Sequence, residues 1–295
     1  MVTADSGPGP AGFGAVDASG DPAALIGFLD VAREVPGLNA AKRSLVEQLA
    51  LGQARAVLDV GCGSGADIAD MARRMPPGTQ VSGVDASETM IAEARRRTSS
   101  LGPRVSLRVG NAIGLPFPDE TFDACRADTV LQHLPDPGQA VSEMARVTRS
   151  GGRVAVLELD LGTTFLDHPD SDTTRIILDT FTDIAVQGWI GRKVPRLFRC
   201  AGLTDVSVTP LVILSNPAFW RILYWQHVAQ LQHQGVLTGE EASRWWADLD
   251  RCAQAGNFLG GATAFVVTAS RRSRRASKAG PYPRRRPPVS PRPSP

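Results

Sequence analysis

The sequence predicts an α/β fold in which a mostly parallel, doubly wound sheet carries helices on both faces. Three observations support this prediction: strand-like and helix-like segments alternate regularly, a glycine-rich loop follows the first strand, and an acidic residue ends the second. Parallel strands joined by helices cross over right-handedly, and ligands bind at the carboxyl ends of such strands. Functional residues are therefore expected directly after each strand.

Short apolar runs separated by amphipathic segments define the elements in order. The first strand, 56–60, ends in glycines, and the helix after it, 66–75, stops at a Pro-Pro-Gly sequence. Further strands are expected at 81–85, 105–109, 122–130 and 153–159, with helices at 87–97 and 138–147. Beyond residue 160 the pattern predicts a helix over 192–198, a strand at 206–208, an aromatic helix around 219–227 and a closing strand at 261–269.

Composition and charge place the chain among soluble globular proteins. Apolar residues make up 42% and charged residues 21%, which is enough to bury a sizeable core. The formal net charge of +2 hides two unlike regions, because nine Arg or Lys and no acidic residue lie between residues 271 and 295. Subtracting these nine charges leaves residues 1–270 at −7, a balance that disfavours nucleic acid as a partner.

A single domain is predicted over 23–270, with both ends of the chain outside it. The composition of residues 1–22 predicts a disordered leader, and that of residues 271–295 predicts a disordered basic tail. The alternative for the tail is an arm that is attracted to nucleic acid or anionic lipid. Neither a signal peptide nor a membrane span of about 18 apolar residues is expected. The four cysteines are widely spaced, which disfavours a metal site or disulfides and favours a soluble, cytoplasmic protein.

The strongest motif is a glycine-rich loop at the end of the first strand, Leu58-Asp59-Val60-Gly61-Cys62-Gly63-Ser64-Gly65. Glycines there let the backbone turn tightly and approach a ligand closely. The GxGxG spacing differs from the GxGxxG fingerprint of dinucleotide-binding proteins, and a sulfonium donor lacks the phosphates that a helix amino terminus would bind. Asp85 ends the second strand about 20 residues later, where an acid can accept both hydroxyls of a ribose. A helix N-cap is the alternative role for Asp85.

Five segments occur in the order of the motifs of class I S-adenosylmethionine-dependent methyltransferases: LDVGCGSG, GVDASETM, GNAIGLPFPDETFD, VLQHLPDP and VTRSGGRV. The chain resembles this family, and more narrowly its branch of ubiquinone/menaquinone-type and natural-product enzymes, over residues 38–160 and weakly to about 270. The resemblance implies a Rossmann-like fold with a seven-stranded sheet and a helical lid insertion. It also implies S-adenosylmethionine as the cofactor, a donor-binding core at about 38–160 and an acceptor part at about 161–260.

The resemblance also implies which residues bind the donor. Asp59 would face its methionine end, Asp85 would hold the ribose, and Asn111 stands where the family commonly carries Asp near the adenine amine. Lys42 or Arg43 could pair with the donor carboxylate, or could belong to a solvated helix face. The predicted cofactor-binding residues are Asp59, Gly61, Cys62, Gly63, Gly65, Asp85, Ala86, Met90, Asn111, Ala112, Arg126 and Ala127.

His133, Glu158 and Asp160 are the candidates for a general base. Alignment of donor and acceptor supplies much of the acceleration of methyl transfer, and a base is needed when the acceptor is a poorly acidic hydroxyl or a carbon acid. His133 follows the fourth strand and titrates near neutral pH, with loop anchoring as its alternative role. Glu158 and Asp160 lie two residues apart, so they share a strand face and either could reach the pocket.

The aromatic segment near residue 220 predicts either ordinary core packing or a lid over an apolar acceptor. Trp220 and Tyr224 lie four residues apart and share a helix face. We predict methyl transfer to a small apolar metabolite, such as a natural-product or quinone-like intermediate of secondary metabolism. A donor-binding protein without methyl transfer and an NAD-dependent oxidoreductase are the alternatives. A nucleic-acid methyltransferase is disfavoured, because Arg126-Ala127-Asp128-Thr129 stands where such enzymes carry [DNS]PP[YF].

Overall fold

The fold is built on one seven-stranded sheet, seen in a computed structural model that describes residues 13–272. The strand order is β3-β2-β1-β4-β5-β7-β6, and β7 runs antiparallel to both of its neighbours while the other pairings are parallel. The strands are β1 (Ala56–Val60), β2 (Gln80–Asp85), β3 (Val105–Val109), β4 (Phe122–Asp128), β5 (Thr148–Leu166), β6 (Leu203–Leu214) and β7 (Gly260–Arg271). The predicted Rossmann-like α/β fold is confirmed.

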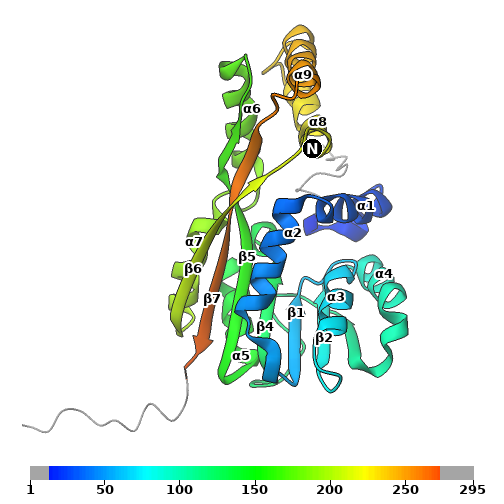
Figure 1. The fold of residues 1–295 in the computed structure, drawn as a ribbon, viewed down its shortest axis with the longest axis vertical. Coiled ribbons are helices and arrows are strands. Elements are labelled where there is room, and N and C mark those ends of the chain that lie inside the picture. Colours follow the sequence, from blue (N-terminus) through cyan, green and yellow to red (C-terminus); the bar gives the residue numbers. More distant parts are fainter. Residues whose placement is uncertain (1–12, 273–295) are drawn as a thin grey trace, which may run out of the picture.

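Helices cover both faces of the sheet, as Figure 1 shows. Alternate strand residues enter opposite layers: Val57 packs toward α2 and α3, whereas Leu58 packs toward α5 and α7. Such a strand, buried on both faces, reads as a continuous apolar run. The helices of these layers are α2 (Pro36–Gln48), α3 (Ala66–Arg74), α4 (Glu88–Thr98), α5 (Pro137–Val147) and α7 (Ile190–Cys200).

Three helices form a cap beyond the carboxyl ends of the central strands, α6 (Ser171–Ile184), α8 (Pro217–His233) and α9 (Gly239–Gln254). The cap has its own apolar core, in which Trp245 is fully buried and its indole Nε1 donates to Thr174 Oγ1 at 2.9 Å. β5 and β7 continue as an antiparallel ribbon beyond the sheet toward the cap, with Phe165 opposite Gly261. The helical lid insertion is therefore two insertions, one before β6 and one after it.

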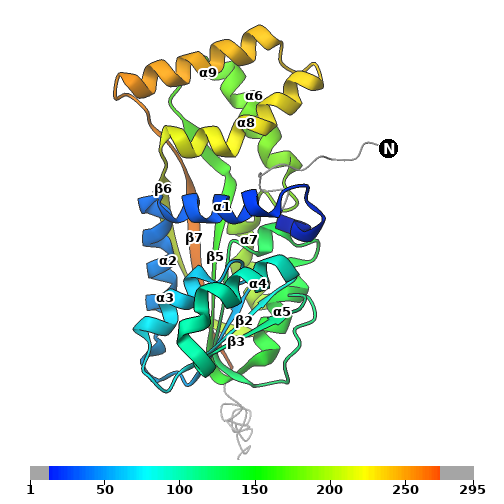
Figure 2. The ribbon, with the colours of Figure 1, turned by 90° about the vertical axis from the view of Figure 1, so that its right-hand side faces the viewer.

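The segment that precedes β1 crosses the carboxyl ends of the strands. The short turn η2 (Val16–Ala18) leads to α1 (Pro22–Arg33), which lies between the cap and the α3–α4 layer in Figure 2. The predicted disordered leader over 1–22 is therefore wrong for residues 13–22, because apolar contacts of Val16 and Leu25 with Met90 hold this segment in place. The rest of the leader, and residues 273–295 of the predicted tail, lie outside the described residues.

Several expected absences concern only the described part of the chain. Within residues 13–272 no helix is long and apolar enough to cross a bilayer. No group of His, Cys, Asp and Glu side chains in the same range is arranged for a metal ion. The cysteines Cys62, Cys125, Cys200 and Cys252 are all unpaired.

Replacement of Trp245 tests whether the cap is stabilised by its own core. Trp245→Ala removes a fully buried ring and should lower the free energy of unfolding by about 3–5 kcal/mol. Trp225 of α8 is 54% exposed and supplies the matched control, because Trp225→Ala should cost less than about 1 kcal/mol. Denaturant unfolding measures both values, and equal losses for the two variants would contradict this account of the cap.

Candidate active site

A pocket of about 370 Å³ lies at the carboxyl ends of the central strands. The segment from η2 to α1 lines one side of it, and α8 of the cap lines another. Ligands of parallel α/β sheets bind at this edge, so the pocket is the candidate active site. Most of the predicted donor residues line it: Asp59, Gly61, Cys62, Gly63, Asp85, Ala86, Met90, Asn111, Ala112 and Arg126.

The glycine loop after β1 has a backbone shape that favours glycine. Gly61 has a φ of +65° and Gly63 a φ of +51°, both in the left-handed region. A Cβ on Gly61 would lie 2.4 Å from Cγ2 of Val130, so the loop packs directly against the chain that follows β4. The amides of Gly61 and Cys62 donate to the Val84 carbonyl of β2 at 2.8 and 3.0 Å. The loop is therefore fixed on two sides by the protein itself.

Asp85 joins the glycine loop to the start of α4. Its Oδ2 accepts from the Gly63 amide at 2.8 Å, and its Oδ1 accepts from the Ser87 amide at 3.0 Å. Ser87, not Asp85, is the N-cap of α4, because its hydroxyl accepts from the Met90 amide. Burial raises the pKa of Asp85. Each carboxylate oxygen has a second acceptor position, so Asp85 is suited to accept hydrogen bonds from a ribose.

A partly buried charge cluster lies at the other end of the pocket and comprises Arg33, Lys42, Asp59, Asp67, Arg126 and Asp128. The Arg126 side chain is 2% exposed, and its Nη2 lies 3.0 Å from Asp128 Oδ2 and 3.4 Å from Asp67 Oδ2. Its Nε lies 3.2 Å from Asp59 Oδ1. Burial raises the pKa of Asp59 to about 7 in spite of this cation, and the charges of Asp67 and Asp128 add to that effect.

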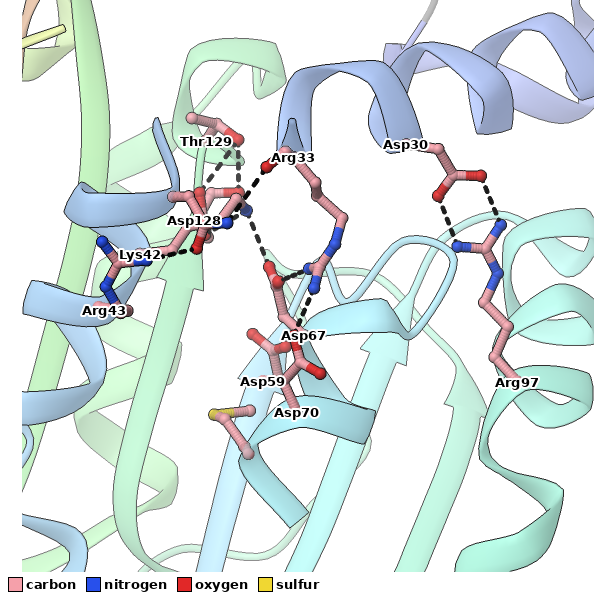
Figure 3. Close-up of polar contacts among 12 residues, drawn as sticks. Asp30, Arg33, Lys42, Arg43, Asp59, Asp67, Asp70, Arg97, Asp128 and Thr129 are labelled. Atoms are coloured by element: carbon pink, nitrogen blue, oxygen red, sulfur yellow. Dashed lines mark hydrogen bonds and ion pairs between the residues drawn. The ribbon is translucent and has the colours of Figure 1, made fainter. Parts of the chain in front are cut away.

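Lys42 and Arg33 supply the remaining positive charge of the cluster. Lys42 Nζ lies 2.8 Å from Asp67 Oδ2 and 2.7 Å from Asp128 Oδ2. Arg33 reaches down from α1 to pair with Asp67 and Asp70, as Figure 3 shows. Burial acts to raise the pKa of Asp67, but the nearby cations hold it well below its usual value. Three cations and three acids therefore offset one another in the cluster.

Sequence reasoning missed two acids of this cluster and the segment above it. Asp128 lies two residues after Arg126 on β4, so its position on the same face was a usable signal. Asp67 lies in the first turn of α3, directly after the glycine loop. The segment above the cluster gave no signal, because its Gly- and Ala-rich composition is typical of disorder.

Residues 13–33 are held over the pocket by acids that pair with α4. Asp17 accepts from the Ser87 hydroxyl at 2.7 Å, and this bond lowers the pKa of Asp17 to about 2. Asp30 of α1 pairs with Arg97 at 2.6 Å, at the right of Figure 3. Phe13, Phe28 and other apolar side chains of the same segment line the pocket. Residues 13–22, which were predicted as part of a leader, therefore form a wall of the site together with α1.

The apolar end of the pocket is formed after β2 and β3. Ala86 and Met90 line it, together with Ala112. Asn111 lines it too, but its Oδ1 accepts from the Ile113 amide at 3.1 Å. The Asn111 side-chain oxygen, which was predicted to contact the adenine amine, thus uses one of its two acceptor positions within the loop. Its second acceptor position is left for the adenine.

Three residues considered for the donor site lie elsewhere. Gly65 is the N-cap of α3, and a Cβ there would lie 2.6 Å from that of Ala94, so this glycine allows α3 to approach α4. Ala127 follows Arg126 on β4 and therefore points into the opposite layer. Arg43 donates to Asn39 on an exposed face of α2. None of the three lines the pocket.

Among the predicted bases, His133 lines the pocket. It ends the short turn η5 (Leu131–His133), which follows β4. Its Nε2 lies 3.1 Å from Nε2 of Gln132, and its ring centroid lies 5.5 Å from that of Phe13. His133 is therefore placed where a side chain could contact an acceptor.

Glu158 and Asp160 share one face of β5, but this face is turned away from the pocket. The face toward the pocket carries Leu157, Leu159 and Leu161. Asp160 is fully buried and pairs with Arg192 of α7. Glu158 is fully buried too, and its Oε1 accepts from the Leu131 amide at 2.6 Å. The expectation that either acid reaches the pocket is wrong, because groups of the opposite layer bind both carboxyls.

The aromatic helix α8 divides its side chains between the cap and the pocket. Trp220 and Tyr224 stack in the cap core with ring centroids 4.7 Å apart. Phe219 and Leu223, one position earlier on the helix, line the pocket. Core packing thus describes one face of α8, and the predicted contact with an acceptor would involve the other.

The buried carboxyl of Glu158 makes stability depend on pH. Burial raises its pKa from 4.5 to about 8, so the folded state binds its proton more tightly than the unfolded state does. This contribution is complete below about pH 4.5 and is lost as the pH rises to about 8, with a slope of at most about 1.4 kcal/mol per pH unit. Glu158→Gln should remove that share of the slope in unfolding titrations. Glu240→Gln, at a side chain that is 88% exposed, is the control, and identical slopes for all three proteins would contradict the prediction.

The comparisons with known proteins agree with this geometry. Residues 57–152, which carry the glycine loop, Asp85 and β4, match the family described as a methyltransferase domain. An uncharacterized 37.1 kDa protein of transposon Tn4556 from Streptomyces fradiae is 34% identical over 248 residues, which are 83% of this chain and 70% of that protein. Methyltransferase GfsG of Streptomyces halstedii is 29% identical over 219 residues, 73% of this chain and 76% of that enzyme.

A solved structure supports the fold as a whole. The YcgJ protein of Bacillus subtilis superposes with a TM-score of 0.57 at 18% identity, covering 80% of this chain and 99% of that one. The glycine loop, the acid after β2 and the matched family model point to the same donor. The chain belongs to the class I methyltransferases, enzymes that use S-adenosylmethionine as the methyl donor.

Proposed function

We propose that this enzyme methylates an uncharged, largely apolar small molecule, such as a natural-product or quinone-like intermediate. The observation that carries the proposal is the lining of the pocket beyond the donor residues. That lining is apolar and comes from α1, α2, β5 and α8: Phe28, Leu38, Leu157, Leu159, Leu161, Phe219 and Leu223. An acceptor that is itself apolar would gain the most from this surface.

The charges in the pocket support an acceptor without phosphate or carboxylate groups. Arg33, Lys42 and Arg126, the cations that line the pocket within residues 13–272, are each paired with acids of the charge cluster. The methionine end of the donor carries one ammonium and one carboxylate, so it can exchange charge for charge with these pairs. An anionic acceptor would need a further cation, and breaking another of the pairs to supply one is costly. The same surroundings, and the unpaired cysteines, support a cytoplasmic enzyme of small-molecule metabolism.

A row of aromatic rings supports the same acceptor class. Phe219 of α8 contacts Phe28 of α1 with centroids 5.7 Å apart, Phe28 contacts Phe13 at 5.8 Å, and Phe13 contacts His133 at 5.5 Å. All four rings line the pocket, and they come from three parts of the chain: residues 13–33, η5 and α8. Such a row gives an apolar acceptor a wall that ends at a titratable imidazole.

For the donor, we propose contacts that use the groups already in place. Asp85 would accept from the ribose hydroxyls, Ala86 and Met90 would pack on the adenine, and the charge cluster would receive the methionine ammonium and carboxylate. The left-handed backbone conformation of Gly61 and Gly63 leaves room for the donor to approach the backbone closely, which fits this donor. When bound, S-adenosylmethionine supplies a methyl group on a sulfonium, which is already activated for displacement.

The chain's own contribution to the chemistry would be alignment and exclusion of water. The apolar wall and the α1 segment enclose the acceptor, and positioning of this kind accounts for much of the acceleration in such a transfer. His133 would accept the acceptor's proton where that acceptor is a poorly acidic hydroxyl or carbon acid. The family match supports methyl transfer over an NAD-dependent oxidation.

The donor contact of Asp85 can be tested by binding alone. Asp85→Asn removes the charge of a hydrogen-bond acceptor and should raise the Kd for S-adenosylhomocysteine about tenfold to hundredfold, which corresponds to about 1.5–3 kcal/mol. Calorimetric titration measures the change, and Asp172→Asn, at a side chain that is 83% exposed, is the matched control. Unchanged affinity in a folded Asp85→Asn protein would remove Asp85 from the donor site.

The acceptor class can be tested with labelled methyl groups. Neutral phenols and quinols should accept label from S-adenosylmethionine, whereas their phosphate esters should not. Phe219→Ala should raise KM for an active acceptor about tenfold to hundredfold, because burying such a ring contributes about 1.5–3 kcal/mol, and should leave S-adenosylhomocysteine binding unchanged. Ile222→Ala, on the exposed side of α8, is the control. Methylation of the phosphate esters alone would contradict the proposed acceptor class.

A further inference from the structure

Glu158 holds the turn that carries His133, although its carboxyl does not face the pocket. Its Oε1 accepts from the Leu131 amide at 2.6 Å, at the start of η5. The nearby amides of Val130 and Gln132 act on the same carboxyl electrostatically and oppose the rise of its pKa by burial. One buried side chain thus anchors this turn through the Leu131 amide.

This turn forms part of the active-site wall. Val130, Gln132 and His133 all line the pocket, and Val130 packs against Gly61 of the donor loop. Thr129, directly before the turn, has a φ of +54°, so the chain reverses sharply there in a conformation that a β-branched residue disfavours. A displacement of the turn would therefore move both the donor loop contact and the His133 ring.

Burying the Glu158 carboxyl in this position costs free energy unless the carboxyl is hydrogen-bonded. The side chain is fully buried in β5, between strand positions that pack into the apolar layers of the sheet. The charged groups near it are Asp128 of β4, which opposes its ionisation, and Asp160 on the same strand face, which is paired with Arg192. No cation compensates Glu158 among the contacts of residues 13–272, so the Leu131 amide of the turn is the group that it binds.

We infer that Glu158 is the positioning residue of this active site: its carboxyl holds the turn from Val130 to His133 against the donor loop and so aims Gln132 and His133 into the pocket. The inference rests on the proposed function, because it presumes that the donor and the acceptor meet at this turn. Glu158, which was predicted as a candidate general base, thus has a different role. In that role the length of its side chain matters and its charge does not.

Three substitutions of Glu158 separate the effect of side-chain length from the effect of charge. Glu158→Gln keeps the Oε1 acceptor at the same distance, and its amide nitrogen replaces Oε2, which makes no hydrogen bond within the described residues. Glu158→Asp keeps the carboxyl but withdraws it by one methylene, and Glu158→Leu removes the acceptor. Asp160→Asn is the matched control, because it alters a second buried carboxyl on the same strand face that binds α7 instead of the turn.

The measurements are amide hydrogen exchange of residues 130–133 and calorimetric binding of S-adenosylhomocysteine. Protection of these amides should fall about tenfold or more in Glu158→Asp and Glu158→Leu, as expected for loss of a buried hydrogen bond, and S-adenosylhomocysteine should bind more weakly. Glu158→Gln should restore both values to within about twofold of the wild type. Asp160→Asn should lower Tm without changing either value.

Loss of protection in Glu158→Gln equal to that in Glu158→Asp would overturn the inference, because charge would then be what matters. Unchanged protection in Glu158→Asp would overturn it as well. If Glu158→Leu does not fold, the Gln and Asp variants still decide between these outcomes. Failure of the wild-type protein to bind S-adenosylhomocysteine would count against the proposed donor contacts, whereas the exchange data test Glu158 alone, so the two failures are distinguishable.

Discussion

The active site depends on the burial of one guanidinium group. Arg126 lies on a central strand with its side chain 2% exposed, and a buried cation requires acids close to it. These acids come from three elements, β1, α3 and β4 itself, through Asp59, Asp67 and Asp128. Their surplus of negative charge is offset in turn by Lys42 of α2 and Arg33 of α1.

This charge balance brings five elements together at the carboxyl edge of the sheet. α1 is drawn across the strands because Arg33 reaches Asp67 and Asp70, and the pairing of Asp30 with Arg97 holds the same helix to α4. The space left between α1 and the glycine loop is the pocket. The mixed charges at one end of the pocket therefore follow from how Arg126 is neutralised.

The two faces of β4 and β5 explain the division of roles at the site. Arg126 and Asp128 lie on the pocket face of β4, while Ala127 between them packs into the opposite layer. On β5 the distribution is the opposite. Leucines face the pocket, and Glu158 and Asp160 face the layer of η5 and α7. Acids thus hold the structure behind the wall, and apolar side chains form its surface.

The sequence predicted the donor half of the fold well because its signals are local. The apolar runs of β1 to β4, the glycine loop and the acid after β2 follow from periodicity and backbone freedom within a few residues. The length of β5 was underestimated, at 153–159 against Thr148–Leu166, because its ends are set by distant partners. Thr148 pairs with Phe122 of β4, and Leu166 pairs with Gly260 of β7, more than 90 residues later. The orientation of Glu158 and Asp160 was not predictable, since their shared spacing is the same for either face of the strand. The wall formed by residues 13–22 depends on contacts such as that of Asp17 with Ser87, which composition does not reveal.

A crystal structure of the protein with S-adenosylhomocysteine bound tests the account most directly. We expect the ribose hydroxyls on Asp85, the adenine against Met90 and the methionine end at the charge cluster around Arg126, with His133 and Phe219 on the side of the ligand where an acceptor would bind. A ligand bound outside this pocket, or one whose ribose lies away from Asp85, would contradict the account.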